Sequence, residues 1–281
     1  MIDPGGLTAE EQTAILADRY SQRAEAYDVF WSPVIRPVGE RLLSKLQLHE
    51  ARRVLDVGTG AGALLPAIQR SAPSATILGV DRSSLGMLNL AKEKHPGPLA
   101  QMDVQDLALP ADQFDSAVVA FVLFHLPQPA QCLKEVHRVL KAGGAVGTVT
   151  WEAEHAPPAN SVWDEELNAV GAQTFELPAV DNRACCDSEE KMTALLEQAG
   201  FVSVKAWREA IEHRWRPEDH FEYQMRGTSL LRLQSLSADD RETCFRRVRQ
   251  RLAGASEEEY SYRGEVVMVT AVKADNAAGV P

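Results

Sequence analysis

Short apolar runs alternate with amphipathic helical segments through the middle of the chain, from Arg53 to Thr150. The apolar runs predict strands at residues 54–57, 76–80, 99–102, 116–121 and 145–150. The segments between them predict helices at residues 63–70, 84–93 and 129–140. Strands that are apolar almost throughout, with helices between neighbours, are typical of a parallel sheet covered on both faces.

The N-terminal part of the chain is predicted to be helical. Thr8 and Glu11 form a capping box that begins a helix, which we expect to reach about Tyr27. The sequence Trp31-Ser32-Pro33 is expected to break this helix, and a second one is predicted over residues 34–46. Both helices precede the first strand and therefore form an N-terminal extension.

The pattern changes after Trp151. It predicts helices at 162–173 and 187–198, a strand at 201–215, a mostly helical stretch at 219–252 and a last strand at 265–273. These two strands and the earlier ones predict a seven-stranded, mostly parallel, doubly wound sheet with helices on both faces. The helical stretch before the last strand is expected to form a cap.

Composition restricts the possible partners. The 281 residues carry a net charge of -11, so we expect no nucleic-acid partner, which would need a basic face. The N-terminus lacks a signal pattern, and the longest apolar run, Ala117–Phe124, is far shorter than a membrane span of roughly 20 residues. We therefore expect a cytoplasmic protein without a membrane span. The cysteine spacing fits neither a disulfide framework nor a metal site, which predicts reduced thiols at Cys132, Cys185, Cys186 and Cys244.

The most informative segment is Leu55-Asp56-Val57-Gly58-Thr59-Gly60-Ala61-Gly62, which reads as the end of a strand, a tight loop and the start of a helix. Glycines allow positive φ and a close approach of a ligand to the backbone. Asp56 is expected at the end of the strand, where its charge would repel a pyrophosphate but attract a cationic sulfonium compound. The segment therefore favours S-adenosylmethionine over a dinucleotide.

Acidic residues also follow the next two predicted strands. Asp81 comes about 20 residues after the glycine loop, where a carboxylate can accept hydrogen bonds from both hydroxyls of a ribose. Asp103 can accept a hydrogen bond from an adenine amine while the Val104 N–H donates to the ring, and Asp106 is a rival at this position. The fourth strand ends at Ala120-Phe121, which we expect beneath the ligand because strand ends face the crevice.

Together these residues resemble the class I S-adenosylmethionine-dependent methyltransferases, in the group with the ubiquinone/menaquinone C-methyltransferases and many natural-product methyltransferases. The resemblance covers Tyr20 to about Thr150 and continues weakly through Leu195–Phe201; it departs at Ala142, where the family usually has proline. It implies a Rossmann-like fold, S-adenosylmethionine as cofactor and S-adenosylhomocysteine as product. The residues expected to bind the cofactor are Tyr20, Asp56, Gly58, Thr59, Gly60, Gly62, Asp81, Arg82, Met87, Asp103, Val104, Ala120 and Phe121.

The resemblance also suggests a division of the chain into functional regions. We expect an N-terminal extension or lid at 1–50, a cofactor-binding core at 51–151, and the rest of the sheet at 152–273. Insertions at about 152–187 and 217–253 are expected to cap the acceptor site and to move on binding. A disordered tail is expected at 274–281.

Methyl transfer requires a base only when the acceptor is a protonated hydroxyl or an unactivated carbon acid. His125 is the first candidate base and His155 the second, with Glu152 and Glu154 as weaker candidates. The acceptor is expected to be small and partly apolar, a secondary metabolite or quinone-like molecule methylated on oxygen or carbon. The oligomeric state is not determined by the pattern, and a homodimer remains open. Apolar residues that could line the acceptor pocket are Trp31, Phe121, Phe124, Trp151, Trp163 and Met225.

Three other functions compete with methyl transfer to a small molecule. An NAD-dependent oxidoreductase is one, because Gly58-x-Gly60-x-x-Ala63 satisfies the looser dinucleotide fingerprint. A protein that binds S-adenosylmethionine and catalyses a rearrangement without methylation is another. A nucleic-acid methyltransferase is the third, suggested by the arginines of residues 246–251, although the acids beside them indicate a solvated helix face of mixed charge.

Overall fold

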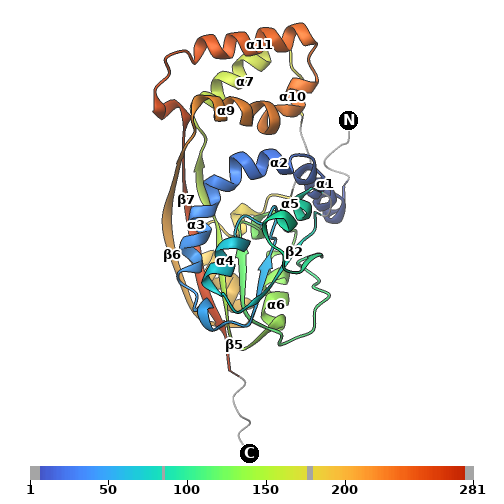
Figure 1. Ribbon diagram of the computed structural model, residues 1–281, viewed down its shortest axis with the longest axis vertical. Coiled ribbons are helices and arrows are strands. Elements are labelled where there is room, and N and C mark those ends of the chain that lie inside the picture. Colours follow the sequence, from blue (N-terminus) through green and yellow to red (C-terminus); the bar gives the residue numbers. More distant parts are fainter. Residues whose placement is uncertain (1–6, 84–85, 176–179, 276–281) are drawn as a thin grey trace, which may run out of the picture.

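The computed structural model describes residues 7–83, 86–175 and 180–275. Its strands form one seven-stranded sheet in the order β3-β2-β1-β4-β5-β7-β6 (Figure 1). The strands are β1 (Arg53–Val57), β2 (Thr76–Asp81), β3 (Leu99–Gln101), β4 (Phe114–Ala120), β5 (Leu140–His155), β6 (Phe201–Arg214) and β7 (Ser261–Lys273).

The first five strands are parallel, and β7 runs antiparallel to both of its neighbours. Val54 in β1 lies opposite Ile77 in β2 and Ser116 in β4, so the carboxyl ends of these strands meet at one edge. Both β1 and β4 are buried almost throughout, as their apolar sequences predict. The predicted doubly wound, mostly parallel sheet is thus confirmed.

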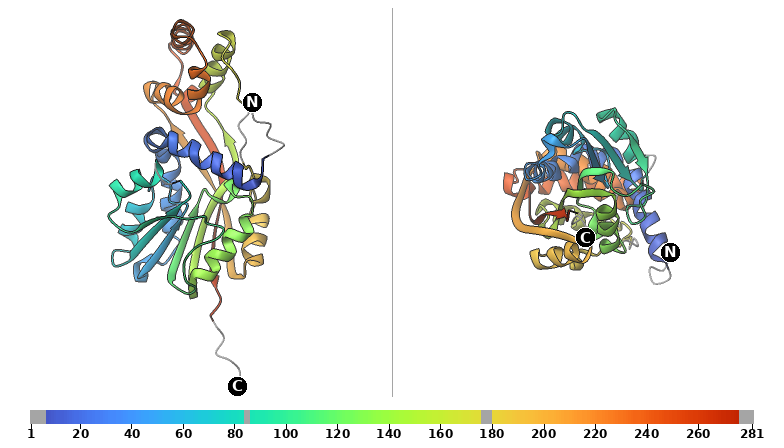
Figure 2. Two further views of the ribbon diagram at one scale, coloured as in Figure 1. Left: turned by 90° about the vertical axis from the view of Figure 1, so that its right-hand side faces the viewer. Right: turned by 90° about the horizontal axis from the view of Figure 1, so that it is seen from below.

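Helices cover both faces of the sheet. The helices α3 (Ser32–Leu43), α4 (Leu65–Ser71) and α5 (Met87–Lys94) form one layer, in which α4 contacts both of the others. The helices α6 (Pro129–Val139) and α8 (Glu189–Gln198) pack together on the other face (Figure 2). This arrangement leaves the carboxyl edge of the parallel strands open, which is where ligands bind in such sheets.

A helical cap stands on the extended ends of β5, β6 and β7 (Figure 1). It has its own apolar core, in which Trp163, Leu233 and Val248 are buried. Arg232 pairs with Asp164 at 3.0 Å, and three further ion pairs join the first and last helices of the cap. The cap helices are α7 (Ala159–Ala169), α9 (Pro217–Tyr223), α10 (Leu230–Gln234) and α11 (Ala238–Arg251).

The predicted break at Trp31-Ser32-Pro33 is wrong. From α1 (Ala9–Gln22) and α2 (Ala24–Ala26) the chain continues through a π-helical turn, η2 (Tyr27–Trp31), directly into α3. Pro33 follows this π-helical turn, at the second position of α3. Thr8 and Glu11 form the predicted capping box. Figure 2 shows this helical segment crossing between the sheet and the cap.

The fifth strand is longer than predicted. It extends over Leu140–His155 rather than residues 145–150, because β7 pairs with it as far as His155 opposite Arg263. No helix in the described residues is long and apolar enough to cross a membrane. The four cysteines, all of them in the described part of the chain, are free. Apart from Ala274 and Asp275, the tail expected at 274–281 lies outside the described residues.

Candidate active site

The glycine loop after β1 is shaped by close packing on both sides. The N–H groups of Gly58 and Thr59 donate to the carbonyl of Val80 at 2.8 and 2.9 Å, which ties the loop to the end of β2. Gly62 has φ +76°, and a Cβ there would lie 2.9 Å from the Cα of Ala91 in α5. Any other side chain would be strained at this positive φ and would clash with Ala91, so only glycine fits here. Because glycine allows this tight turn, the loop leaves the strand ends open.

Asp81 lies beside this loop at the end of β2. Its carboxylate accepts hydrogen bonds from the N–H groups of Gly60 at 2.9 Å and Ser83 at 2.8 Å. Burial raises the pKa of Asp81, and these hydrogen bonds oppose the rise. The carboxylate lines a cavity of about 140 Å³ together with Gly58 and Met87. A carboxylate has about four acceptor positions, so two remain for a ligand.

Asp103 and Val104 lie at the far side of the same cavity. Asp103 accepts a hydrogen bond from Arg82 at 2.7 Å and another from the N–H of Gln105 at 2.9 Å. Both Arg82 and Asp103 line the cavity, and their ion pair orients the carboxylate. Val104 is buried and adds an apolar wall.

Asp56 does not face this cavity. It is 3% exposed beneath the loop, where it accepts a hydrogen bond from the Thr59 hydroxyl at 2.6 Å. Burial raises the pKa of Asp56 to about 6. Asp56 and Thr59 line a smaller cavity between the loop, the end of β4 and α3, which Arg36 also lines.

Ala120 and Phe121 complete the lining of this smaller cavity, at the end of β4. Phe121 also lines the cavity that contains Asp81, so it separates the two spaces. Its φ is +60°, a left-handed conformation that is strained for an aromatic residue. Packing of its ring against Trp151, with centroids 4.8 Å apart, holds it there. Strain of this kind accumulates at functional sites.

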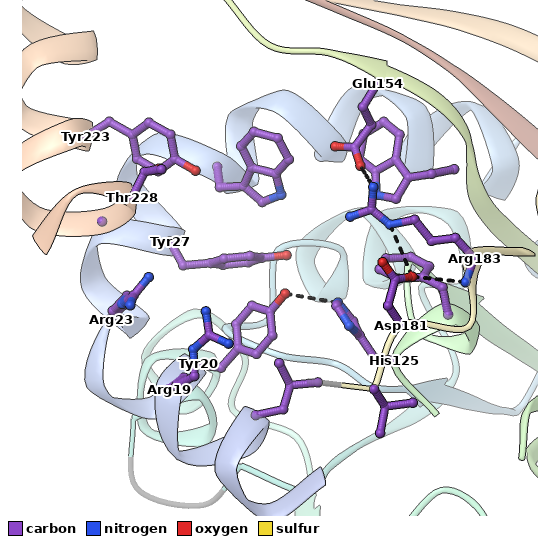
Figure 3. Close-up of a pocket in the computed structure, with 16 residues that line it drawn as sticks. Arg19, Tyr20, Arg23, Tyr27, His125, Glu154, Asp181, Arg183, Tyr223 and Thr228 are labelled. Atoms are coloured by element: carbon purple, nitrogen blue, oxygen red, sulfur yellow. Dashed lines mark hydrogen bonds and ion pairs between the residues drawn. The ribbon is translucent and has the colours of Figure 1, made fainter. Parts of the chain in front are cut away.

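A third cavity, of about 420 Å³, lies between the N-terminal helices, the strand ends and the cap (Figure 3). Six aromatic and five charged side chains line it. Tyr20, Tyr27 and His125 line both this cavity and the one that contains Asp81, so the two adjoin. The aromatic side chains around it are Tyr20, Tyr27, Trp31, Phe124, Trp151 and Tyr223.

His125 and Tyr20 meet where these two cavities join. The Tyr20 hydroxyl and Nε2 of His125 share a hydrogen bond of 3.0 Å, whose donor is set by the imidazole tautomer. Burial, together with the charge of Arg183, lowers the pKa of His125 to about 4. Burial raises the pKa of Tyr20 to about 12. At neutral pH the imidazole is therefore unprotonated and able to accept a proton.

Arg183 closes the opposite side of the large cavity. It forms an ion pair with Glu154, and Asp181 lies 3.7 Å from its guanidinium. Glu154 also accepts a hydrogen bond from Tyr262 at 2.7 Å. Arg183 lies over the ring of Phe124, at 5.6 Å from its centroid. Both acids of this wall are thus occupied by Arg183.

The structure gathers most, but not all, of the predicted residues. The cavity with Asp81 is lined by ten of the predicted site residues, and the cavity with Arg36 by three more. The ten are Tyr20, Gly58, Gly60, Asp81, Arg82, Met87, Asp103, Val104, Phe121 and His125. The three are Asp56, Thr59 and Ala120. Gly62 packs against α5 instead.

His155 and three of the six expected pocket residues lie outside the large cavity. One of the three, Phe121, lines the two smaller cavities instead. His155 is exposed at the end of β5, because side chains alternate along a strand and Glu154 takes the inward position. Trp163 is buried in the core of the cap, and Met225 packs against that core.

Three arginines that line these cavities were not predicted from the sequence: Arg19, Arg23 and Arg36. The spacing of Arg19, Arg23 and Tyr27 on one helix face was the available signal.

Comparisons with known proteins agree with this architecture. Residues 55–147 match the family described as a methyltransferase domain. A nocamycin O-methyltransferase of Saccharothrix syringae is 27% identical over 69% of this chain and 75% of its own length. The ubiquinone/menaquinone biosynthesis C-methyltransferase UbiE of Geobacter sulfurreducens is 41% identical over 35% of this chain and 41% of its own length.

Solved structures share the fold at low sequence identity. The cyclase SpnF superposes with a TM-score of 0.57 and 16% identity, over 96% of this chain and 98% of its own. The YcgJ protein of Bacillus subtilis has a TM-score of 0.54 and 18% identity, over 85% of this chain and all of its own. The matched methyltransferase domain spans the glycine loop and the acids that follow it, so the chain carries an S-adenosylmethionine-dependent methyltransferase domain similar to those of class I, with S-adenosylmethionine as its cofactor.

Proposed function

We propose that the enzyme methylates a small, partly apolar acceptor on oxygen or carbon in the 420 Å³ cavity. The observation that carries the proposal is the junction of two chemically different spaces. One contains Asp81 and the glycine loop, and the other is walled by aromatic rings. Methyl transfer requires the cofactor and the acceptor to come into contact. His125 and Tyr20 line both cavities and so mark the place where this contact would occur.

The residues of the two smaller cavities fit S-adenosylmethionine. Asp81 would accept the ribose hydroxyls, and Asp103 with Val104 would receive the adenine. The methionine end would extend toward the cavity beneath the loop, where Asp56 suits its ammonium group and Arg36 its carboxylate. The cofactor supplies a methyl group already activated by positive sulfur.

The chain contributes alignment, exclusion of water and a proton acceptor. Correct alignment is worth up to ~7–11 kcal/mol in favourable systems. His125 would take the proton of the acceptor at Nδ1, in the tautomer whose Nε2–H donates to the Tyr20 oxygen and so holds the imidazole in place. Because burial lowers the pKa of His125 to about 4, this base suits acceptors with acidic hydroxyls, such as phenols and enols.

The cap and the N-terminal helices would close the acceptor site. Tyr223 and Thr228 from the cap line the large cavity opposite the N-terminal residues Tyr20 and Tyr27. Arg226 pairs with Glu25 at 3.3 Å across this boundary. Tyr223 also stacks on Trp31 across this boundary, so opening the cap would separate aromatic rings as well as this exposed ion pair.

The competing functions find less support in this site. An oxidoreductase would place a pyrophosphate beside the glycine loop, above the buried carboxylate of Asp56. The arginines of α11 that suggested nucleic acid are partly engaged: Arg251 pairs with Glu166 at 2.9 Å, and Arg249 lies over the Phe221 ring. A rearrangement without methylation stays the main rival, since SpnF, described as a cyclase, shares the fold.

Calorimetric titration with S-adenosylhomocysteine and, separately, NADH tests the cofactor. We expect S-adenosylhomocysteine alone to bind. Incubation with radiolabelled S-adenosylmethionine and a panel of phenols, enols and quinols then tests the reaction, with transfer of label to an acceptor as the expected result. Binding of NADH alone would refute the proposal, and conversion of an acceptor without loss of the cofactor's methyl group would support the rearrangement.

A further inference from the structure

Arg19 and Arg23 form a pair of cations without acidic partners. They are one helical turn apart at the end of α1, both are half-buried, and both line the large cavity (Figure 3). Within the described residues neither side chain forms an ion pair, and the Nε of Arg19 is buried without a hydrogen-bond partner. Burial, followed by the charge of Arg19, lowers the pKa of Arg23. Two adjacent, half-buried cations repel each other unless an anion lies between them.

The nearby acids are directed elsewhere. Asp18 accepts a hydrogen bond from Gln22 at 2.6 Å, and Glu25 pairs with Arg226 on the cap. On the other side of the cavity, Arg183 occupies both Glu154 and Asp181. Figure 3 shows this neutralised group and the two free arginines on opposite sides. One side of the cavity is therefore positive in a chain whose net charge is -11.

The cofactor does not account for this pair of arginines. The large cavity is not lined by the glycine loop, Asp81 or Asp103. The space beside Asp56 has its own cation, Arg36, for a cofactor carboxylate. Arg19 and Arg23 instead border the aromatic part of the large cavity, which Trp31 and Tyr223 wall with rings 6.2 Å apart and 13° from parallel.

We propose that Arg19 and Arg23 bind an oxyanion of the acceptor, a carboxylate or a phosphate ester, while its flat apolar body packs among the aromatic rings of the cavity. This inference rests on the proposed function, because it takes the large cavity as the acceptor site. Two guanidinium groups offer up to ten N–H donors in planar forks, which match either anion. A positive wall also raises the local concentration of an anionic substrate.

Three probes built on the same naphthalene ring test the inference: 2-naphthoate, 2-naphthyl phosphate and neutral 2-naphthamide. Each is titrated by calorimetry into the full-length protein, with and without saturating S-adenosylhomocysteine. We expect at least one anion to bind ten-fold or more tightly than the amide. The stronger of the two anions distinguishes a carboxylate acceptor from a phosphate ester.

Variants assign this preference to the two arginines. Arg19→Gln and Arg23→Gln are each expected to weaken the preferred anion about ten-fold, with amide binding changed less than three-fold. Arg19→Lys is expected to retain part of the preference. Arg246→Gln is the matched control, because it removes the same charge from an exposed position on α11. Circular dichroism melting verifies that each variant is folded.

The inference fails if anions and amide bind equally, if no probe binds, or if Arg246→Gln weakens the anion as much as Arg19→Gln does. It also fails if Arg19→Gln weakens the amide as much as the anion, since that result indicates a packing role. The proposed function fails separately, in the titration of S-adenosylhomocysteine. The titrations without that ligand measure the charge preference in either case.

Discussion

Replacement of Asp81 by asparagine perturbs the proposed cofactor site at one atom. The carboxylate accepts N–H hydrogen bonds from Gly60 and Ser83, one on each oxygen. Asp81→Asn removes the negative charge and turns one oxygen into an NH2 group. Whichever way the amide lies, this NH2 group faces a backbone N–H, donor against donor.

The expected loss follows from the hydrogen bonds that remain for a ligand. A hydrogen bond to a charged group contributes roughly 1.5–3 kcal/mol, and a ribose offers two hydroxyls to Asp81. Two such bonds contribute ~3–6 kcal/mol, and the amide keeps one neutral bond worth ~0.5–1.5 kcal/mol, so the loss is ~3 kcal/mol. This corresponds to a dissociation constant for S-adenosylhomocysteine about 100-fold higher.

Calorimetric titration of S-adenosylhomocysteine measures the effect, with Asp239→Asn on an exposed position of α11 as the control. Loss of one backbone hydrogen bond lowers stability by ~1–3 kcal/mol, so urea unfolding separates a folding defect from a binding defect. A folded Asp81→Asn protein that binds within three-fold of the native affinity would refute the reasoning. A similar loss in Asp239→Asn would refute it equally.

Three further outcomes follow from the geometry. Gly62→Ala should lower the free energy of unfolding in urea by ~1–3 kcal/mol more than Gly171→Ala. Both glycines have φ +76°, but only at Gly62 would the added Cβ clash with Ala91, so equal losses would disprove the packing argument. His125→Gln should lower kcat by ~10²-fold or more, and native kcat should stay flat from pH 6 to 8, since the imidazole is unprotonated there; a native rate that rises through pH 7 would contradict this. Burial lowers the pKa of His220 to about 4, so between pH 6.5 and pH 4 the unfolded chain takes up a proton there that the folded chain does not. The free energy of unfolding should therefore be highest above about pH 6.5 and should decrease by up to ~3 kcal/mol toward pH 4. Urea unfolding at pH 5 and 7.5 should show a smaller decrease in His220→Gln than in the native protein.

The proposed cofactor site was largely predictable from the sequence. The glycine loop and the acids at positions 81 and 103 each lie at the carboxyl end of an apolar strand. Because these strands are parallel, their carboxyl ends lie at the same edge of the sheet. The large cavity, which we propose holds the acceptor, was less predictable. Trp31, Phe124 and Trp151 line it, whereas Trp163 is buried in the core of the cap. The sequence around each of these residues gives no sign of this difference.

Local chain geometry thus determined the strands, the glycine loop and the order of acidic residues, because each depends on neighbours within a few positions. The tertiary structure alone decided which face of β5 points inward, so that Glu154 and not His155 reaches the cavity. It also decided that Arg19 and Arg23 border a space closed by residues about 200 positions away, such as Tyr223. Burial and charge compensation depend on contacts between distant segments, and those contacts exist only when the sheet, the N-terminal helices and the cap have assembled.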